Sequence, residues 1–478
     1  MNHYFISHFK KRANSFQNVT ANSQAIYNIL STAILSGINF ITIPLFTRLL
    51  GAEQYGLYSV FHSWVIIIMC FITLECRSGL GTAKYVFKEK YEEYKSSSLM
   101  FGLMAATVFI LISITFRNQL SEIFGYSPSV VILVFISALG YHLIEFAKNA
   151  YIYEKKAQKN FILSVSLAIL TVALSFLFLK VECFEEKFLA RAYGDVLPYL
   201  TMSAVIVMVT LKKTPPKCNK EYWKHCFIMG FPIVFHGLSQ DILKQSDRIM
   251  MQHMGYAGTT VGIYSFFCTY TAIVNVLLTA LNTTWCPFYY DDLNEKAYEK
   301  LKGKCNNYLE LFTIVTCGFL LVSREMCYFF ASREYWTGMN VIPLLVIGIY
   351  FIFMYQFPVN FEFYLKKTKI IAIGTFSAAI VNIVLNIILI PKWGMYGAAL
   401  ATAVSYGLLF VAHYAIAANM REMKFHMNLK SFTPGLSAVL VFSLLFYTTH
   451  NFWILRWISG ILIGSFGIFR IIKRKRIF

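Results

Sequence analysis

Four polar side chains with helical spacing stand inside an otherwise apolar stretch of the sequence. Asp241, Lys244, Gln245 and Arg248 follow one another at steps of three, one and three residues, so they share one face of a helix. Ionisable groups in a membrane-spanning helix are costly unless they face water or a partner. The pattern therefore predicts that this face, with Gln240 beside it, lines a hydrated pathway. The alternative is that Lys244 extends to the lipid head groups and neutralises Asp241.

A second polar stripe lies close to the N-terminus. Asn28, Thr32 and Asn39 are four and seven residues apart, which is about one and two helical turns. Close packing of helices through small and polar residues would explain this stripe equally well. The similar stripe around Asp241 favours the interpretation that both stripes line the same cavity.

Three side chains are candidates for coupling transport to ions or protons: Asp241, His236 and Glu145. For Glu145 an ordinary ion pair with the nearby Lys148 at the membrane interface is the alternative. A single histidine such as His236 is a weak signal by itself. Asp195 and Glu362 lie close to predicted helix ends and are not included in the candidate site. Asparagines at 275, 282, 382 and 386 are predicted to form hydrogen bonds between helices.

The composition is typical of an integral membrane protein. The chain has 478 residues, of which 57% are hydrophobic and only 14% are charged, against about a quarter charged in soluble domains. The net charge of +19 comes from basic residues in short loops, which is a topology signal, so no nucleic-acid partner is expected. Ten cysteines without regular spacing indicate neither a disulfide framework nor a metal site.

No sequence motif indicates catalysis or a cofactor. The stretch nearest to a phosphate-binding loop, 79–84, lacks the required spacing and the Ser or Thr. No loop is long enough to hold a nucleotide-binding or catalytic domain. We therefore expect a protein that is not an enzyme, has no catalytic residues, metal or ATP site, and draws energy from an ion gradient or the membrane potential.

Apolar segments of about twenty residues predict the fold class. We expect an all-α polytopic membrane protein with about 14 transmembrane helices. Their approximate bounds are 24–47, 57–76, 98–116, 129–148, 161–182, 191–211, 226–247, 260–284, 307–325, 340–363, 370–390, 395–418, 434–449 and 453–470. About three quarters of the Lys and Arg residues lie in the termini and in alternate loops, which places both termini in the cytoplasm.

The sequence also contains an internal repeat. The hexapeptide Gly-Leu-Tyr-Ser-Val-Phe at 56–61 is nearly repeated as Gly-Ile-Tyr-Ser-Phe-Phe at 262–267. Helices one to six and seven to twelve are thus expected to form two pseudo-symmetric lobes with the pathway between them. The predicted divisions are 1–211 for the N lobe, 212–418 for the C lobe, and 419–478 for two additional helices and a basic tail.

Three stretches, 34–61, 231–290 and 367–406, resemble the polysaccharide transporters of the multidrug/oligosaccharidyl-lipid/polysaccharide exporter superfamily. The matching residues are Pro44, Thr47-Arg48, Gly51 and Gly56-Leu-Tyr-Ser59 in the first stretch, Pro232, Asp247-Arg248, Gly262 and Pro287 in the second, and Asn382, Asn386, Pro391, Gly394 and Gly397 in the third. Members of this family flip lipid-linked oligosaccharides, the O-antigen flippases among them.

The resemblance implies a specific substrate and location. The protein would move undecaprenyl-pyrophosphate-linked oligosaccharides across a bacterial cytoplasmic (inner) membrane by alternating access, for O-antigen lipopolysaccharide, capsule or exopolysaccharide synthesis. Arg48, Lys244 and Arg248 would then offset desolvation of the diphosphate, with Asn28, Asn39, Gln240 and Gln245 contacting sugar or water. Membrane lipids, and a polymerase and chain-length protein of the same pathway, would be partners.

Two other functions remain open from the sequence. A multidrug or cation antiporter of the same fold would need a carboxylate in the cavity, for which Asp241 is the candidate, although the adjacent Lys244 opposes cation binding. A membrane glycosyltransferase or polymerase of the same pathway would need a sizeable loop with acidic residues, which this chain lacks.

Overall fold

The protein consists of helices throughout the part of the chain that the structure describes. The computed structural model describes the backbone of residues 21–474 and the side chains of residues 37–38, 40–467 and 469–470. The long helices are α2 (Ala21–Met69), α4 (Tyr91–Thr115), α6 (Pro128–Tyr153), α7 (Ala157–Val181), α8 (Lys187–Lys213), α9 (Lys220–His253), α10 (Gly258–Asn294), α11 (Tyr298–Phe330), α12 (Ile342–Tyr364), α13 (Thr368–Ala418), α14 (Thr433–Thr448) and α15 (Trp453–Arg474). Short helices α3 (Leu80–Val86), η1 (Lys88–Lys90), α5 (Arg117–Phe124), η2 (Arg333–Val341) and η3 (Leu429–Ser431) connect them.

The predicted spans all appear as helices. Ten of the described helices are long and apolar enough to cross a membrane. Nine of these contain one predicted span each, and α13 contains two. Helix α2, which is not among the ten, contains two more spans, and α15 contains the last. The predicted fold class, an all-α membrane protein with about 14 spanning segments, is confirmed.

Two pairs of spans are joined more directly than we predicted. Instead of a loop between 47 and 57, α2 continues from the first span into the second and changes direction at Gly51, where φ is 73° and ψ is 167°. In α13 the same occurs at Gly394, with φ 54° and ψ −129°. Glycine adopts these dihedral angles without a Cβ clash, so one residue replaces a loop.

The second span ends earlier than its predicted limit of 76. Helix α2 ends at Met69, and residues 70–79 form a series of turns in which Leu74 and Glu75 both have a φ of 52°. Side chains with a Cβ rarely adopt this left-handed conformation. Most of the segment is buried against the rest of the N lobe, which is where irregular backbone at membrane depth is tolerated.

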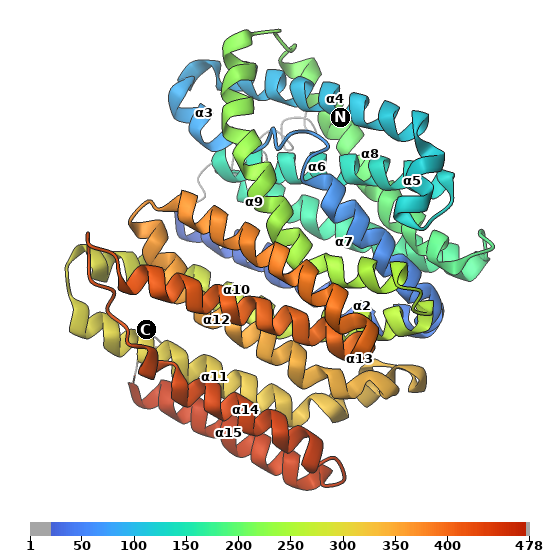
Figure 1. The fold of residues 1–478 in the computed structure, drawn as a ribbon. Coiled ribbons are helices and arrows are strands. Elements are labelled where there is room, and N and C mark those ends of the chain that lie inside the picture. Colours follow the sequence, from blue (N-terminus) through green and yellow to red (C-terminus); the bar gives the residue numbers. More distant parts are fainter. Residues whose placement is uncertain (1–20, 475–478) are drawn as a thin grey trace, which may run out of the picture.

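The helices form two groups, and α2 of one group and α9 of the other lie where the two groups meet (Figure 1). We use "N lobe" for α2–α8 and "C lobe" for α9–α13, and α14 and α15 pack on α11 at the far side of the C lobe. Helix α9 contacts both lobes: Tyr222 and Cys226 join a cluster of buried N-lobe residues, whereas Ser246 donates a hydrogen bond to Asn382 of α13 at 3.2 Å.

The two copies of the repeated hexapeptide meet where α2 crosses α10. A Cβ atom on Gly56 would lie 2.7 Å from the backbone nitrogen of Gly262, and a Cβ on Gly262 would lie 1.8 Å from the carbonyl oxygen of Ala52. The two backbones therefore touch, and only glycine fits at either position. The internal repeat thus supplies a close backbone contact between the lobes.

Two of the four predicted asparagines, Asn282 and Asn382, form hydrogen bonds between helices of the C lobe. Asn386 donates within its own helix, and among the described residues the Asn275 side chain forms no hydrogen bond to another helix. Asn382 accepts hydrogen bonds from Ser246 and from Asn386 one turn away, at 3.2 and 3.1 Å. Asn282 of α10 donates to Gln356 of α12 at 3.1 Å and accepts from Asn360 at 3.0 Å. Such bonds contribute about 1 kcal/mol each between helices in lipid.

Candidate functional site between the lobes

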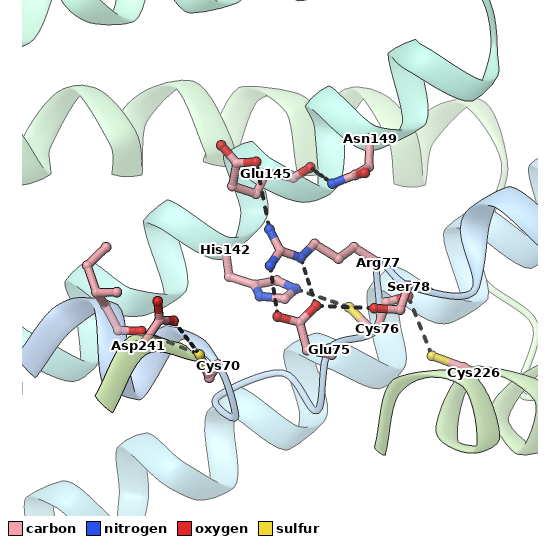
Figure 2. Close-up of polar contacts among 11 residues, drawn as sticks. Cys70, Glu75, Cys76, Arg77, Ser78, His142, Glu145, Asn149, Cys226 and Asp241 are labelled. Atoms are coloured by element: carbon pink, nitrogen blue, oxygen red, sulfur yellow. Dashed lines mark hydrogen bonds and ion pairs between the residues drawn. The ribbon is translucent and has the colours of Figure 1, made fainter. Parts of the chain in front are cut away.

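The predicted polar face of α9 lies against the second half of α2. Asp241 accepts a hydrogen bond from the Cys70 thiol at 2.9 Å, and Gln245 accepts one from the Ser63 hydroxyl at 3.0 Å. Figure 2 shows the Asp241–Cys70 contact. A third polar contact, from the Tyr55 hydroxyl to Thr269 of α10 at 3.4 Å, continues this line along α2. Residues 55 and 63 are eight residues apart and share one face of α2, and Cys70 continues this line immediately after the helix ends.

The cations of this face differ in their surroundings. The Arg248 guanidinium donates to Gln245 at 3.0 Å, and its Nε atom is buried without a partner among the described residues. Lys244 is exposed and forms no ion pair within the described part of the chain, although its charge acts on Asp241 and His236. Gln240 is half-buried beside it.

The remaining candidates are spread over the molecule. Arg48 is exposed near the Gly51 bend, where it donates to the carbonyl of Phe329 on α11 at 3.1 Å. His236 lies 3.4 Å from the Thr375 hydroxyl of α13. The side chains of Asn28, Thr32 and Asn39 lie outside the described residues, although their backbone belongs to α2.

Glu145 belongs to a cluster of charged groups at the irregular segment 70–79 (Figure 2). Arg77 forms two hydrogen bonds of 2.8 Å with Glu75 and lies 3.7 Å from a carboxylate oxygen of Glu145. The other Glu145 oxygen pairs with Lys148 at 2.6 Å. Glu145 therefore has two cationic partners, one of which is the predicted Lys148. We placed Glu75 at the end of a predicted helix and Arg77 in the loop after it, and missed the cluster; two charges near the end of an apolar run were the available signal.

Helix α9 contacts this same segment with its first half. A Cβ on Gly230 would lie 2.4 Å from the carbonyl oxygen of Leu74 and 3.0 Å from that of Glu75. The Cys226 thiol lies 3.7 Å from the carbonyl oxygen of Cys76. Besides the polar contacts of α9 with Ser63 and Cys70, the lobes thus pack backbone against backbone near Gly56 and near Gly230.

A buried polar group in the N lobe was missed by the sequence analysis. Asp195 of α8 accepts hydrogen bonds from the hydroxyls of Tyr58, at 2.8 Å, and Tyr141. The Arg191 guanidinium stacks on the ring of Tyr58 at 5.0 Å and donates to Ser175 at 2.5 Å. The four-residue spacing of Arg191 and Asp195 places both on one helix face, a signal that proximity to the helix end led us to disregard.

The C lobe also contains a buried aspartate that, like Asp195, accepts a hydrogen bond from a tyrosine hydroxyl. Asp247 is buried and accepts hydrogen bonds from the Tyr264 hydroxyl at 2.5 Å and from the backbone N–H of Arg248 at 2.8 Å. These contacts connect α9 to α10. Among the described residues, no three His, Cys, Asp or Glu side chains gather as they would around a metal ion.

Comparison with known proteins identifies the family. A family model described as "Polysaccharide biosynthesis protein" matches residues 22–290, more than half of the chain. "Probable low-salt glycan biosynthesis flippase Agl15" of Haloferax volcanii is 20% identical, with 82% of each chain covered. "Capsular polysaccharide biosynthesis protein CapF" of Staphylococcus aureus is 22% identical, over 82% of this chain and 97% of that one.

Solved structures of low sequence identity share the fold. The lipid II flippase MurJ in an inward closed conformation superposes with a TM-score of 0.69 at 14% identity, over 95% of this chain and all of that one. A multidrug resistance MATE transporter in an inward-facing conformation gives 0.59 at 12% identity, over 86% and 95%. With a MurJ- and MATE-like fold and a family match that covers the N lobe and the first two helices of the C lobe, the chain belongs to the polysaccharide biosynthesis protein family of flippase-like membrane transporters.

Proposed function

We propose that the protein flips an undecaprenyl-pyrophosphate-linked oligosaccharide across the bacterial cytoplasmic membrane, for O-antigen, capsule or exopolysaccharide assembly. The observation that carries this proposal is the polar face of α9 meeting Ser63 of α2 and Cys70, the first residue after α2, between the lobes. A diphosphate loses water when it enters the membrane, and cations offset that loss. Lys244, exposed and without an ion pair among the described residues, is placed to meet the diphosphate first, and Arg248 follows one turn deeper.

The two contacts between the lobes suggest how the pathway opens alternately. With both termini in the cytoplasm, the Gly56–Gly262 contact lies toward the outer side and the Gly230–Leu74 contact lies toward the inner side. Release of the second contact would admit the head group from the cytoplasm, and release of the first would let it leave. The acyl chain would remain in lipid throughout, so only the hydrophilic head crosses between the lobes.

For ion coupling we favour Asp241 over Glu145 and His236. The side-chain partner of Asp241 is a neutral thiol, so binding of a proton or cation there breaks no ion pair. Glu145 already pairs with Arg77 and Lys148, and His236 contacts one hydroxyl. A multidrug antiporter gains no specific support, because Lys244 acts on the same Asp241 carboxylate, and nothing favours a glycosyltransferase or polymerase.

The function is testable in proteoliposomes. A lipid-linked oligosaccharide with a fluorescent sugar, placed in one leaflet, should become accessible to a quencher on the other side only when the protein is present. Lys244→Gln should slow this at least about tenfold, the effect of losing one cation at a desolvated phosphate, whereas Lys220→Gln, at the exposed start of α9, should not. Unchanged flipping in Lys244→Gln would remove that lysine from the site, and no flipping by the wild-type protein would overturn the proposal.

A further inference from the structure

The outer surface of the N lobe carries an apolar groove with a basic end. It lies between α7 and α8 and has a volume of about 460 Å³; its walls include Ile162 and Leu163 of α7, Met202, Val205 and Ile206 of α8, and Lys159 at one end. Ile162 and Val205 are exposed, and the lobe interior lies on the other side of these helices. The groove is therefore separate from the site between the lobes.

Packing explains why the space exists. Helices α7 and α8 run antiparallel and touch at Gly194, where a Cβ would lie 2.4 Å from the Cα atom of Ser175. Toward the start of α7 no glycine brings the backbones together, and larger side chains such as Leu163 and Met202 stand between them. The groove is the gap that remains at the membrane-facing side.

Both helices become basic beyond the same end of the groove. Lys155 and Lys159 lie at the start of α7, and Lys212 and Lys213 at the end of α8, all of them exposed. Lys213 pairs with Glu92, but Lys155, Lys159 and Lys212 form no ion pair within the described residues. Tyr151 of α6 also lines the groove, and aromatic residues are common at the level of the head groups.

We propose that this groove binds an anionic phospholipid, with the upper part of one acyl chain between α7 and α8 and the phosphate against Lys159. From Lys159 to Leu163 the helix rises about 6 Å, so the groove holds the chain just below its head group. Lysines at this depth favour anionic over zwitterionic lipids. The proposed ligand is a lipid of the surrounding membrane, so the proposal does not depend on which substrate the protein transports.

Native mass spectrometry of the delipidated protein tests the proposal. Phosphatidylglycerol should be retained about fivefold better than phosphatidylcholine with the same acyl chains. Lys159→Gln should remove that preference, and Val205→Trp, which fills the groove, should remove retention of both lipids. Lys180→Gln, at the other end of α7, and Leu197→Trp, which is exposed on α8 beyond the end of the groove farther from Lys159, are the matched controls and should behave as the wild type does.

Crosslinking of the wild-type protein tests the same site without a substitution. A photoreactive phosphatidylglycerol should attach to residues 201–206 and not to 176–181. Equal retention of both lipids by the wild type, undiminished phosphatidylglycerol binding in Val205→Trp, or crosslinks spread evenly over α8 would each overturn the proposal. Displacement of phosphatidylglycerol by undecaprenyl phosphate at equal concentration would assign the groove to the substrate's chain and would also overturn it.

Discussion

Tyr58 and Tyr264 occupy the same position in the two copies of the repeat, and each donates its hydroxyl to a buried aspartate. The partner is Asp195 in the N lobe, at 2.8 Å, and Asp247 in the C lobe, at 2.5 Å. The two aspartates lie on helices that are not equivalent, α8 and α9. The repeat therefore conserves the donor, and each lobe supplies its own acceptor from a different helix.

This difference between the acceptors predicts unequal effects of removing the two hydroxyls. Asp195 retains the Tyr141 hydroxyl when Tyr58 is replaced by Phe, whereas Asp247 has no second side-chain hydroxyl donor among the described residues. Tyr264→Phe should therefore lower the free energy of unfolding by about 1–2 kcal/mol and Tyr58→Phe by less. Thermal unfolding in detergent measures both, and a larger effect of Tyr58→Phe would contradict this account.

The contact between the repeats predicts that Gly262 tolerates no side chain. In Gly262→Ala the new methyl group would lie 1.8 Å from the Ala52 carbonyl oxygen, so α2 and α10 must separate at a cost of about 1–3 kcal/mol or more. We expect a lower melting temperature and slower flipping. Gly318→Ala in α11, where a Cβ meets nothing within 4 Å, is the control and should be neutral or stabilising. Equal melting temperatures for Gly262→Ala and Gly318→Ala would show that α2 and α10 do not approach each other this closely.

Cysteine accessibility should show whether the exposed part of α9 faces water or lipid. Cysteine at position 244 should react with a membrane-impermeant, charged thiol reagent, while cysteine at 243 or 249 should not, because Leu243 and Ile249 are buried. Labelling is measured as the increase over the wild-type protein. A cysteine at 244 that reacts only with apolar maleimides would place Lys244 toward the acyl chains and exclude it from the pathway.

Acid should destabilise the protein through His426, in the loop between α13 and η3. Burial lowers the pKa of His426 to about 4 from its ordinary 6.5, and its Nε2 atom lies 3.4 Å from the Cys305 thiol. The unfolded chain binds a proton below pH 6.5 while the folded protein does not. The contribution of His426 to the free energy of unfolding is therefore complete above pH 6.5. About 3 kcal/mol of it is lost as the pH falls from 6.5 toward 4. His426→Asn should have a shallower decline in melting temperature between pH 6.5 and 4, and parallel curves would contradict the assignment.

Hydropathy predicted the spans because each must cover about 30 Å of hydrocarbon with apolar residues. The connections were predicted less well. A glycine at a positive φ, such as Gly51 or Gly394, redirects the chain within a single residue, so nearby polar residues such as Arg48, Glu53 and Lys392 lie in the helices that flank the bend and not in a loop. The turns at 70–79 escaped prediction because an apolar run continues as far as Leu74, and the left-handed conformation of Leu74 and Glu75 has no distinctive sequence signal.

Part of the candidate site could be predicted because charge is conspicuous in an apolar helix. Asp241, Gln245 and Arg248 do lie on one face, and that face meets the other lobe. Their partners Ser63 and Cys70 are small and neutral, and such residues are common in any spanning helix. Only the tertiary structure identifies which of them faces α9.

The bends of α2 and α13 at Gly51 and Gly394, where two helices meet at a single residue, matter to anyone who would map the topology with inserted tags. An epitope or reporter enzyme placed at either bend would separate two directly joined helices and disturb the backbone that positions both spans. The turn at 295–297, which separates two complete helices and is largely exposed, is the site where such an insertion should leave the protein intact.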